Sequence, residues 1–97
     1  MDIGHAIKSL RCKQSVTQGE LAERIGMSVN AVSAWELGKS FPPRDSIKRI
    51  CDAFGIPTSF LLLSTIEEND LPEDKRVLYH AVVEPLKNEL IETSKSE

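Results

Sequence analysis

The sequence has 97 residues, of which 40% are hydrophobic and 28% are charged, and its formal net charge is −3. These values are typical of one small globular domain, whose modest core can gain stability from association with a second copy. The sequence contains no run of 18 apolar residues, and its first residues lack the basic and apolar regions of a signal peptide. We therefore expect no membrane partner and a cytoplasmic protein.

The charge is unevenly distributed along the chain. Residues 1–55 carry eight basic and six acidic residues, a net charge of +2, whereas residues 56–97 carry four basic and nine acidic residues, a net charge of −5. The net charge of the whole chain argues against nucleic acid, but this distribution favours a first half that can meet phosphate groups. It also indicates a different role for the second half.

Few residues in the sequence suggest metal or catalytic chemistry. Cys12 and Cys51 fall at positions typical of helix cores, and two widely spaced cysteines do not form a disulfide framework. His5 and His80 have no paired metal ligand nearby. Because no nucleophile–base pair or phosphate-binding loop is visible either, we expect no metal, no cofactor and no enzymatic activity.

The spacing of apolar residues is helical almost throughout, and hardly any segment alternates like a strand. A first helix is predicted at about residues 2–13. Thr17 and Glu20 fit a capping box that begins a second helix, and Gly26 ends it. Ser28 caps a third helix, which Gly38 ends and which buries two apolar residues, Val32 and Trp35.

Two more helices and a separate C-terminal stretch follow. After a loop with two adjacent prolines, a fourth helix is predicted at about residues 44–54 and a fifth from Pro57 or Thr58. Residues 67–70 are polar and suggest a hinge, after which Pro72 suits the start of a sixth helix. Its apolar stripe comprises Val77, Leu78, Ala81, Val82, Leu86 and Leu90, and Pro85 either kinks this helix or splits it in two.

The second and third helices carry the strongest functional signal. Gly26 to Ser28 leave only about three residues for the turn between them, which presents the third helix outward from the domain. An ordinary amphipathic helix would carry charges on its outer side. This helix instead carries small, amide or apolar side chains there, which suit close approach to DNA base edges: Val29, Asn30, Ser33, Ala34 and Leu37.

These residues belong to a longer pattern: Thr17-Gln18-x-x-Leu21-Ala22-x-x-Ile25-Gly26-x-Ser28-x-x-x-Val32-Ser33-x-Trp35-Glu36-x-Gly38-Lys39. It resembles the Cro/repressor (XRE-type) helix-turn-helix family, and the resemblance covers about residues 3–63. It implies an all-α fold, a five-helix lambda-repressor-like DNA-binding domain, here with an additional C-terminal helical segment. We expect the domain at residues 1–66 and the extension, as a dimerisation element, at residues 67–97.

The resemblance also implies roles for individual residues. Gln18 would bind a phosphate and brace the third helix, and the N–H groups near Thr17 would add a phosphate contact. Arg11 and Glu36 match a structural salt bridge of the family. Pro57 departs from the usual Ser or Thr cap. The DNA-binding residues that the resemblance implies are Thr17, Gln18, Ser28, Val29, Asn30, Ser33, Ala34, Lys39, Ser40 and Arg44.

Of the base-facing residues, Asn30 is the best direct reader, because an amide can pair with adenine. Val29 and Ala34 stand where polar side chains often read bases in the family, so these two suit thymine methyl groups instead. Lys39, Ser40 and Arg44 would hold the DNA backbone, and Arg44 could alternatively reach a narrow minor groove.

The expected partner is double-stranded DNA with a near-palindromic operator, bound by a homodimer that pairs through helix five and the C-terminal helices. Such a dimer spaces two recognition helices about 34 Å apart. Residues 72–91 either fold back on the domain or pair with a second copy, and we favour pairing. The expected function is a transcriptional regulator, most simply a repressor. An antitoxin, a restriction–modification controller or a protein-interaction adaptor remain alternatives.

Overall fold

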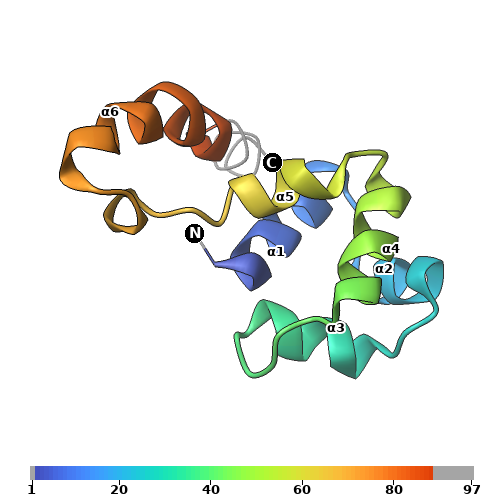
Figure 1. The fold of residues 1–97 in the computed structure, drawn as a ribbon. Helices are drawn as coiled ribbons and strands as arrows, with labels where there is room; N and C mark the ends of the chain where they lie inside the picture. The colour runs from blue at the N-terminus through green and yellow to red at the C-terminus, as the bar shows by residue number, and fades with distance from the viewer. Residues whose placement is uncertain (1, 89–97) are drawn as a thin grey trace.

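A computed structural model describes residues 2–88 of the chain (Figure 1). The first part consists of α1 (Ile3–Lys13), α2 (Gln18–Ile25), α3 (Val29–Glu36), α4 (Arg44–Phe54) and α5 (Thr58–Leu63). The second part consists of two 3₁₀ turns, η1 (Glu68–Asp70) and η2 (Glu73–Lys75), then α6 (Arg76–Leu78) and a π-helical turn, η3 (Tyr79–Val83). Residues 2–88 contain no strand, which confirms the all-α prediction.

The helix ends follow the predicted caps. The Thr17 hydroxyl accepts a hydrogen bond from the Glu20 N–H at 3.0 Å, and the Glu20 carboxylate accepts one from the Thr17 N–H at 2.9 Å. At the start of α3, the Ser28 hydroxyl accepts a hydrogen bond from the Ala31 N–H at 3.1 Å. Gly26 ends α2 in the left-handed conformation, with φ of 71°. Local side chains therefore fix the turn between α2 and α3.

One hydrophobic core unites α1 to α5. α2 packs against α3 and α4, while α1 packs against α3 and α5. A Cβ at Gly4 would overlap the Trp35 carbonyl oxygen, so the close approach of α1 to α3 depends on this glycine. The buried cluster comprises Ile3, Ala6, Ile7, Leu10, Val16, Leu21, Ala22, Ile25, Val32, Trp35, Ile47, Ile50, Cys51, Phe54 and Leu61.

The C-terminal segment, residues 67–88, projects from the side of the molecule formed by α1 and α5 (Figure 1). Its helix runs without a break from 76 to 88, so Pro85 does not split it. Proline lacks an N–H group and its ring displaces the carbonyl one turn earlier, and the wider π-helical turn of η3 lies at that place. The sequence had left a kink and a split open, and the structure contains one continuous helix.

The buried side of this helix is not the apolar stripe that the sequence predicted. Tyr79, Val83 and Lys87 form its buried side. Val77, Leu78 and Val82, which belong to the predicted apolar stripe, are instead 69, 53 and 52% exposed. The predicted stripe is therefore an outer face in the single chain, and its last member, Leu90, lies outside the described residues.

The segment predicted as a hinge has regular structure. Its residues 68–70 form η1, and the Glu67 N–H donates to the Asp70 carboxylate at 2.8 Å. Pro72 precedes the short turn η2, and α6 begins only at Arg76. Within residues 2–88, no helix is long and apolar enough to cross a bilayer.

Candidate nucleic-acid interface

α3 presents a smooth outer side close to its N-terminus. Ser28, Val29 and Asn30 are exposed, and Ser33 and Ala34 are half-buried one turn later. The opposite side of the helix is anchored in the core by Val32 and Trp35, which are 0 and 3% exposed. Trp35 anchors α3 in the core, and Ser33 and Ala34 on its outer side are small, so another surface can approach the α3 backbone closely at these two residues.

Polar side chains continue this surface beyond the C-terminal end of α3. Lys39 and Ser40 are exposed in the loop, and Arg44 is exposed as the first residue of α4. The loop is tied to α3 by the Lys39 N–H, which donates to the Ala34 carbonyl at 2.9 Å. Two cations and a hydroxyl are therefore exposed between the end of α3 and the start of α4.

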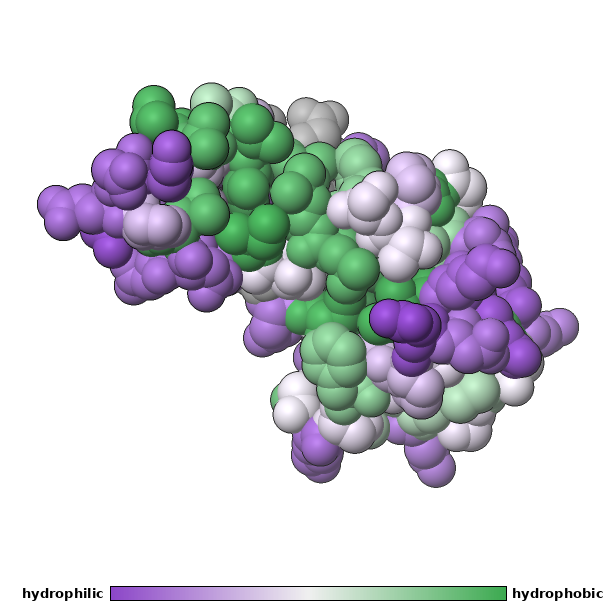
Figure 2. Space-filling model, viewed as in Figure 1, coloured by the Kyte–Doolittle hydropathy of each residue, from purple (hydrophilic) through white to green (hydrophobic). Residues whose placement is uncertain are grey.

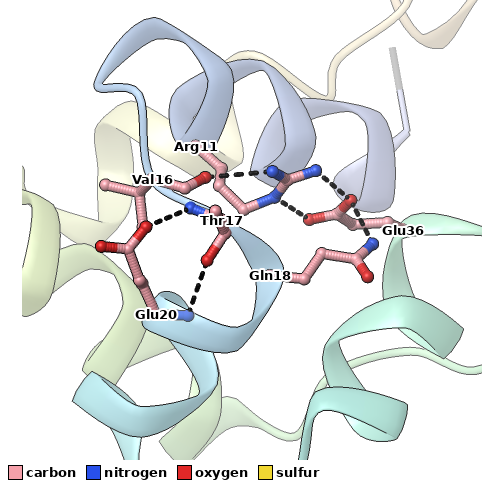
Figure 3. Close-up of polar contacts among 6 residues, drawn as sticks. All are labelled: Arg11, Val16, Thr17, Gln18, Glu20 and Glu36. Carbon is pink, nitrogen blue, oxygen red and sulfur yellow. Dashed lines mark hydrogen bonds and ion pairs between the residues drawn. The ribbon is translucent and has the colours of Figure 1, made fainter.

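A hydrogen-bonded network locks α3 to α1 and α2 (Figure 3). The Arg11 guanidinium donates from Nε and Nη2 to the two Glu36 oxygens, at 2.8 and 2.9 Å, and from Nη1 to the Val16 carbonyl at 3.0 Å. The side chains of Arg11 and Glu36 are only 13 and 3% exposed. The hydrogen bonds to Glu36 raise the pKa of Arg11 above its ordinary value. The salt bridge that the resemblance implied is present.

Gln18 takes part in the same network. Its amide Nε2 donates to Glu36 Oε1 at 3.0 Å, which links the first residue of α2 to the last residue of α3 (Figure 3). The side chain is half-buried, so it is oriented by the protein before any ligand arrives. This geometry matches the bracing role that was expected of Gln18.

The N-terminus of α2 is partly occupied by the protein itself. The Thr17 and Glu20 N–H groups are both used in the capping box, and the Glu20 carboxylate lies at the positive end of the helix. The hydrogen bond from the Thr17 backbone lowers the pKa of Glu20. A phosphate at this helix end would therefore meet a nearby carboxylate as well as the remaining N–H groups.

Two residues beside this surface were not singled out from the sequence. Arg49 on α4 donates to the Ile25 carbonyl at the end of α2, at 3.1 Å. Phe41 is 69% exposed between two clefts of ≈ 580 and ≈ 450 Å³, both of which Leu62 also lines. Residue spacing could reveal neither the contact of Arg49 nor the position of Phe41, because both depend on how helices far apart in the sequence pack together. Among the described residues, no cluster of three His, Cys, Asp or Glu could hold a metal ion.

The profile of a helix-turn-helix family, HTH_3, matches residues 7–61, which are more than half of the chain. The chain therefore belongs to the XRE-type helix-turn-helix family of DNA-binding domains. It is 30% identical over 86 residues to the HTH-type transcriptional activator BcrR of Enterococcus faecalis, a match that covers 84% of this chain.

The chain is also 27% identical over 70 residues, 72% of its length, to the SPbeta prophage-derived uncharacterized HTH-type transcriptional regulator YonR of Bacillus subtilis. These matches span only 42% of the length of the first relative and 65% of the second. No solved structure matches the chain.

Proposed function

We propose that this protein binds double-stranded DNA sequence-specifically through α3 and regulates transcription. The observation that carries the proposal is the exposed, uncharged outer side of α3 on a helix held from behind by Trp35 and the Arg11–Glu36 pair. Such a helix fits the major groove, where small side chains allow contact with base edges. The family and the names of the two relatives support this proposal.

Base recognition is assigned to the first turns of α3. Asn30 is exposed and its amide can pair with the N6 and N7 atoms of adenine, while Val29 and Ala34 can contact thymine methyl groups. Ser33 can bond either a base edge or a phosphate. Ser28 has its hydroxyl engaged as the helix cap, so its contribution is to present the helix start to DNA.

Affinity is assigned to groups that flank α3. Gln18, held by Glu36, and the N-terminus of α2 near Thr17 face one phosphate strand, and Lys39, Ser40 and Arg44 face the other. Phosphate contacts fix the register and supply most of the affinity, so binding should weaken steeply as salt is raised. Because Glu20 shares the α2 N-terminus, Gln18 carries more of that phosphate contact than the helix end does.

The test is selection of bound sequences from random DNA, followed by fluorescence anisotropy with the selected site and with random DNA. Asn30→Ala should lower the preference for the selected site by about five- to tenfold with little change in affinity for random DNA. Lys39→Ala is the matched control, since it should weaken both DNAs together and reduce the salt dependence. Equal weakening of both DNAs by Asn30→Ala would contradict the base contact.

We further propose that the DNA-bound form is a homodimer. Apolar side chains gather over the C-terminal segment and continue over α5 and α1 (Figure 2). The exposed apolar residues of these elements include Leu62 of α5, at 43% exposure, and Val77, Leu78 and Val82 of the C-terminal helix; Phe41, from the loop before α4, lines two clefts with Leu62. A second copy related by a two-fold axis could cover both parts, since helix five and the C-terminal helices lie on the same side.

Sedimentation equilibrium tests the dimer. The double variant Leu78→Ser with Val82→Ser should shift the protein toward monomer and weaken operator binding, because two half-sites would then be held independently. Val29→Ser, which also removes an exposed apolar residue but lies on α3, should leave the mass unchanged. A wild-type chain that remains monomeric at high concentration, on DNA as well as free, would overturn this proposal.

Regulation by such a dimer is most simply repression, since a bound operator excludes polymerase, and a promoter-reporter assay decides its sign. Under this proposal, residues 1–66 form the DNA-binding domain and residues 67–97 form the dimerisation element. The protein would act in the cytoplasm. The exposed C-terminal face also favours one second candidate, a protein-interaction adaptor. Partner binding that survives Asn30→Ala and Gln18→Ala in a chain without sequence preference would support the adaptor.

A further inference from the structure

Arg49 joins α4 to the turn of the helix-turn-helix. Its Nη1 donates to the Ile25 carbonyl at 3.1 Å and would lie 3.6 Å from a Cβ placed on Gly26. Its Nε is 3.0 Å from the Asp45 carboxylate, one turn earlier on α4. The guanidinium therefore lies against the residues where the chain leaves α2 for α3.

The carbonyl that Arg49 holds is one of the last in α2. Carbonyls in the final turn of a helix have no partner within that helix, and the negative end of the helix dipole favours a cation there. The left-handed Gly26 uses its own N–H for the Ala22 and Glu23 carbonyls. Arg49 supplies a donor from another element for the Ile25 carbonyl, and Asp45 orients that donor.

α2 is thus held at both of its ends, by α3 at one and by α4 at the other. At the far end, Gln18 of α2 bonds Glu36 of α3 at 3.0 Å. At the near end, the α2 terminus is fixed to α4 by Arg49. With the distal end already anchored, a change in the angle of the turn would displace mainly the first residues of α3, which include Asn30.

We propose that Arg49 is a positioning residue for DNA recognition, acting through the α2 terminus to place Asn30 against the bases. The inference rests on the proposed function. It requires no contact between Arg49 and DNA. Its signature is a loss of discrimination between selected and random DNA that disappears when Asn30 is already absent.

The experiment compares Arg49→Met with Lys48→Met, which removes the same charge from the adjacent exposed position on α4. Each variant is checked for folding by circular dichroism, and binding to the selected site and to random DNA is measured over a range of salt. Arg49→Met should lower discrimination about fivefold with an unchanged salt slope, whereas Lys48→Met should leave discrimination unchanged. In an Asn30→Ala background, Arg49→Met should cause no further loss.

Arg49→Lys provides a second variant if the methionine variant folds poorly. It keeps the charge but has all its donors on one nitrogen, without the fork that holds both Ile25 and Asp45, so discrimination should lie between wild type and Arg49→Met. A salt slope that falls by about one, with both DNAs weakened equally, would make Arg49 a phosphate contact and overturn the proposal. Unchanged discrimination in Arg49→Met, in a wild type that does select a sequence, would overturn this inference alone. A wild type without any selected sequence would overturn the proposed function as well.

Discussion

The α1–α5 region and the C-terminal segment are held together by different forces. The first has a continuous apolar core from Ile3 to Leu61. The second buries Tyr79, Val83 and Lys87, and Lys87 Nζ donates to the Tyr79 hydroxyl at 2.9 Å and to the Glu67 carboxylate at 3.0 Å. One region is stabilised mainly by area removed from water and the other largely by polar contacts.

The two regions also differ in the groups that they leave exposed or unpaired. The outer helix face of the C-terminal segment exposes Val77, Leu78 and Val82, and within residues 2–88 the Arg76 Nε atom is buried without a hydrogen-bond partner. A small domain that folds as a single chain usually leaves few exposed apolar patches and few buried polar atoms without a hydrogen bond. The α1–α5 region also exposes Phe41 and Leu62, so the dimer proposed above draws on both regions, whereas the buried core that anchors α3 lies within α1–α5.

The largest expected effect separates the two regions by core truncation. Leu21→Ala, at a fully buried position in α2, should lower the free energy of unfolding by about 2–5 kcal/mol in urea titrations, because it leaves a cavity in a packed core. Val83→Ala should leave the main transition nearly unchanged. It should instead speed amide hydrogen exchange within the C-terminal segment.

Val77→Ala is the control for both, since this side chain is 69% exposed and its truncation should change little. If Val83→Ala cost as much as Leu21→Ala in the main transition, the two regions would unfold as one unit. The contrast between them would then be one of composition only.

The next effect concerns the Arg11–Glu36 ion pair, whose two side chains are 13 and 3% exposed. Glu36→Gln should destabilise the protein by about 2–3 kcal/mol, because it leaves the Arg11 guanidinium largely buried without a counter-charge. Asp45→Asn, at a side chain that is 72% exposed, should change stability little. Chemical denaturation of both variants measures the difference.

A double variant, Arg11→Met with Glu36→Leu, sharpens this prediction. Removal of both charges abolishes the desolvation cost as well as the attraction, so much of the lost stability should return. DNA binding by the double variant should stay weaker than that of the wild type, because Gln18 would lack its Glu36 partner. A double variant as unstable as Glu36→Gln would show that packing around the pair, and not the unpaired charge, dominates.

The same contrast decides how much the sequence could predict. The capping box of Thr17 and Glu20, the Ser28 cap and the stop at Gly26 depend on a few adjacent residues, and all are present. The Arg11–Glu36 pair spans 25 positions and was predicted only through the family resemblance.

The sequence predicted structure less well where contacts between distant residues determine it. The buried face of the C-terminal helix contains a lysine, Lys87, which no hydrophobic pattern marks as a buried residue. The π-helical turn before Pro85 depends on how the helix absorbs a missing N–H group, and the sequence left that open. Arg49 has the spacing of an ordinary surface pair with Asp45, and only the packing of α4 on α2 reveals its bond to Ile25.

A smaller effect is expected at the connection between α1 and α2. Ser15 adopts φ of 55°, a left-handed conformation that costs most side chains free energy. Ser15→Gly should raise the free energy of unfolding by about 0.5–1 kcal/mol, measured by urea titration. Gln14→Gly is the control, since Gln14 has φ of −99° and gains nothing from glycine. Stabilisation by both variants would show that the connection tolerates glycine for reasons other than its backbone conformation.

The smallest effect is confined to the C-terminal segment and depends on pH. His80 lies between two carboxylates, with Nδ1 at 3.0 Å from Glu84 of its own helix and Nε2 in contact with Glu68 of η1. The Tyr79 ring meets it edge-on at 5.5 Å between centroids. The hydrogen bond to Glu84, aided by the charge of Glu68, raises the pKa of His80 above its ordinary value.

A raised pKa in the folded state means that the protonated imidazole favours the folded segment. Its contribution is complete below the ordinary histidine pKa of about 6.5 and is lost as pH rises through the higher, folded value. Protection factors for amide exchange in residues 79–88, measured by NMR between about pH 5.5 and 8.5, should therefore fall with rising pH while those of α2 and α4 stay constant. His80→Gln should abolish the dependence, because glutamine carries no charge at any of these pH values. If protection in α2 and α4 fell in parallel, the proton would be coupled to the whole fold, and the C-terminal segment would not be the separately stabilised element that its exposed face and polar contacts indicate.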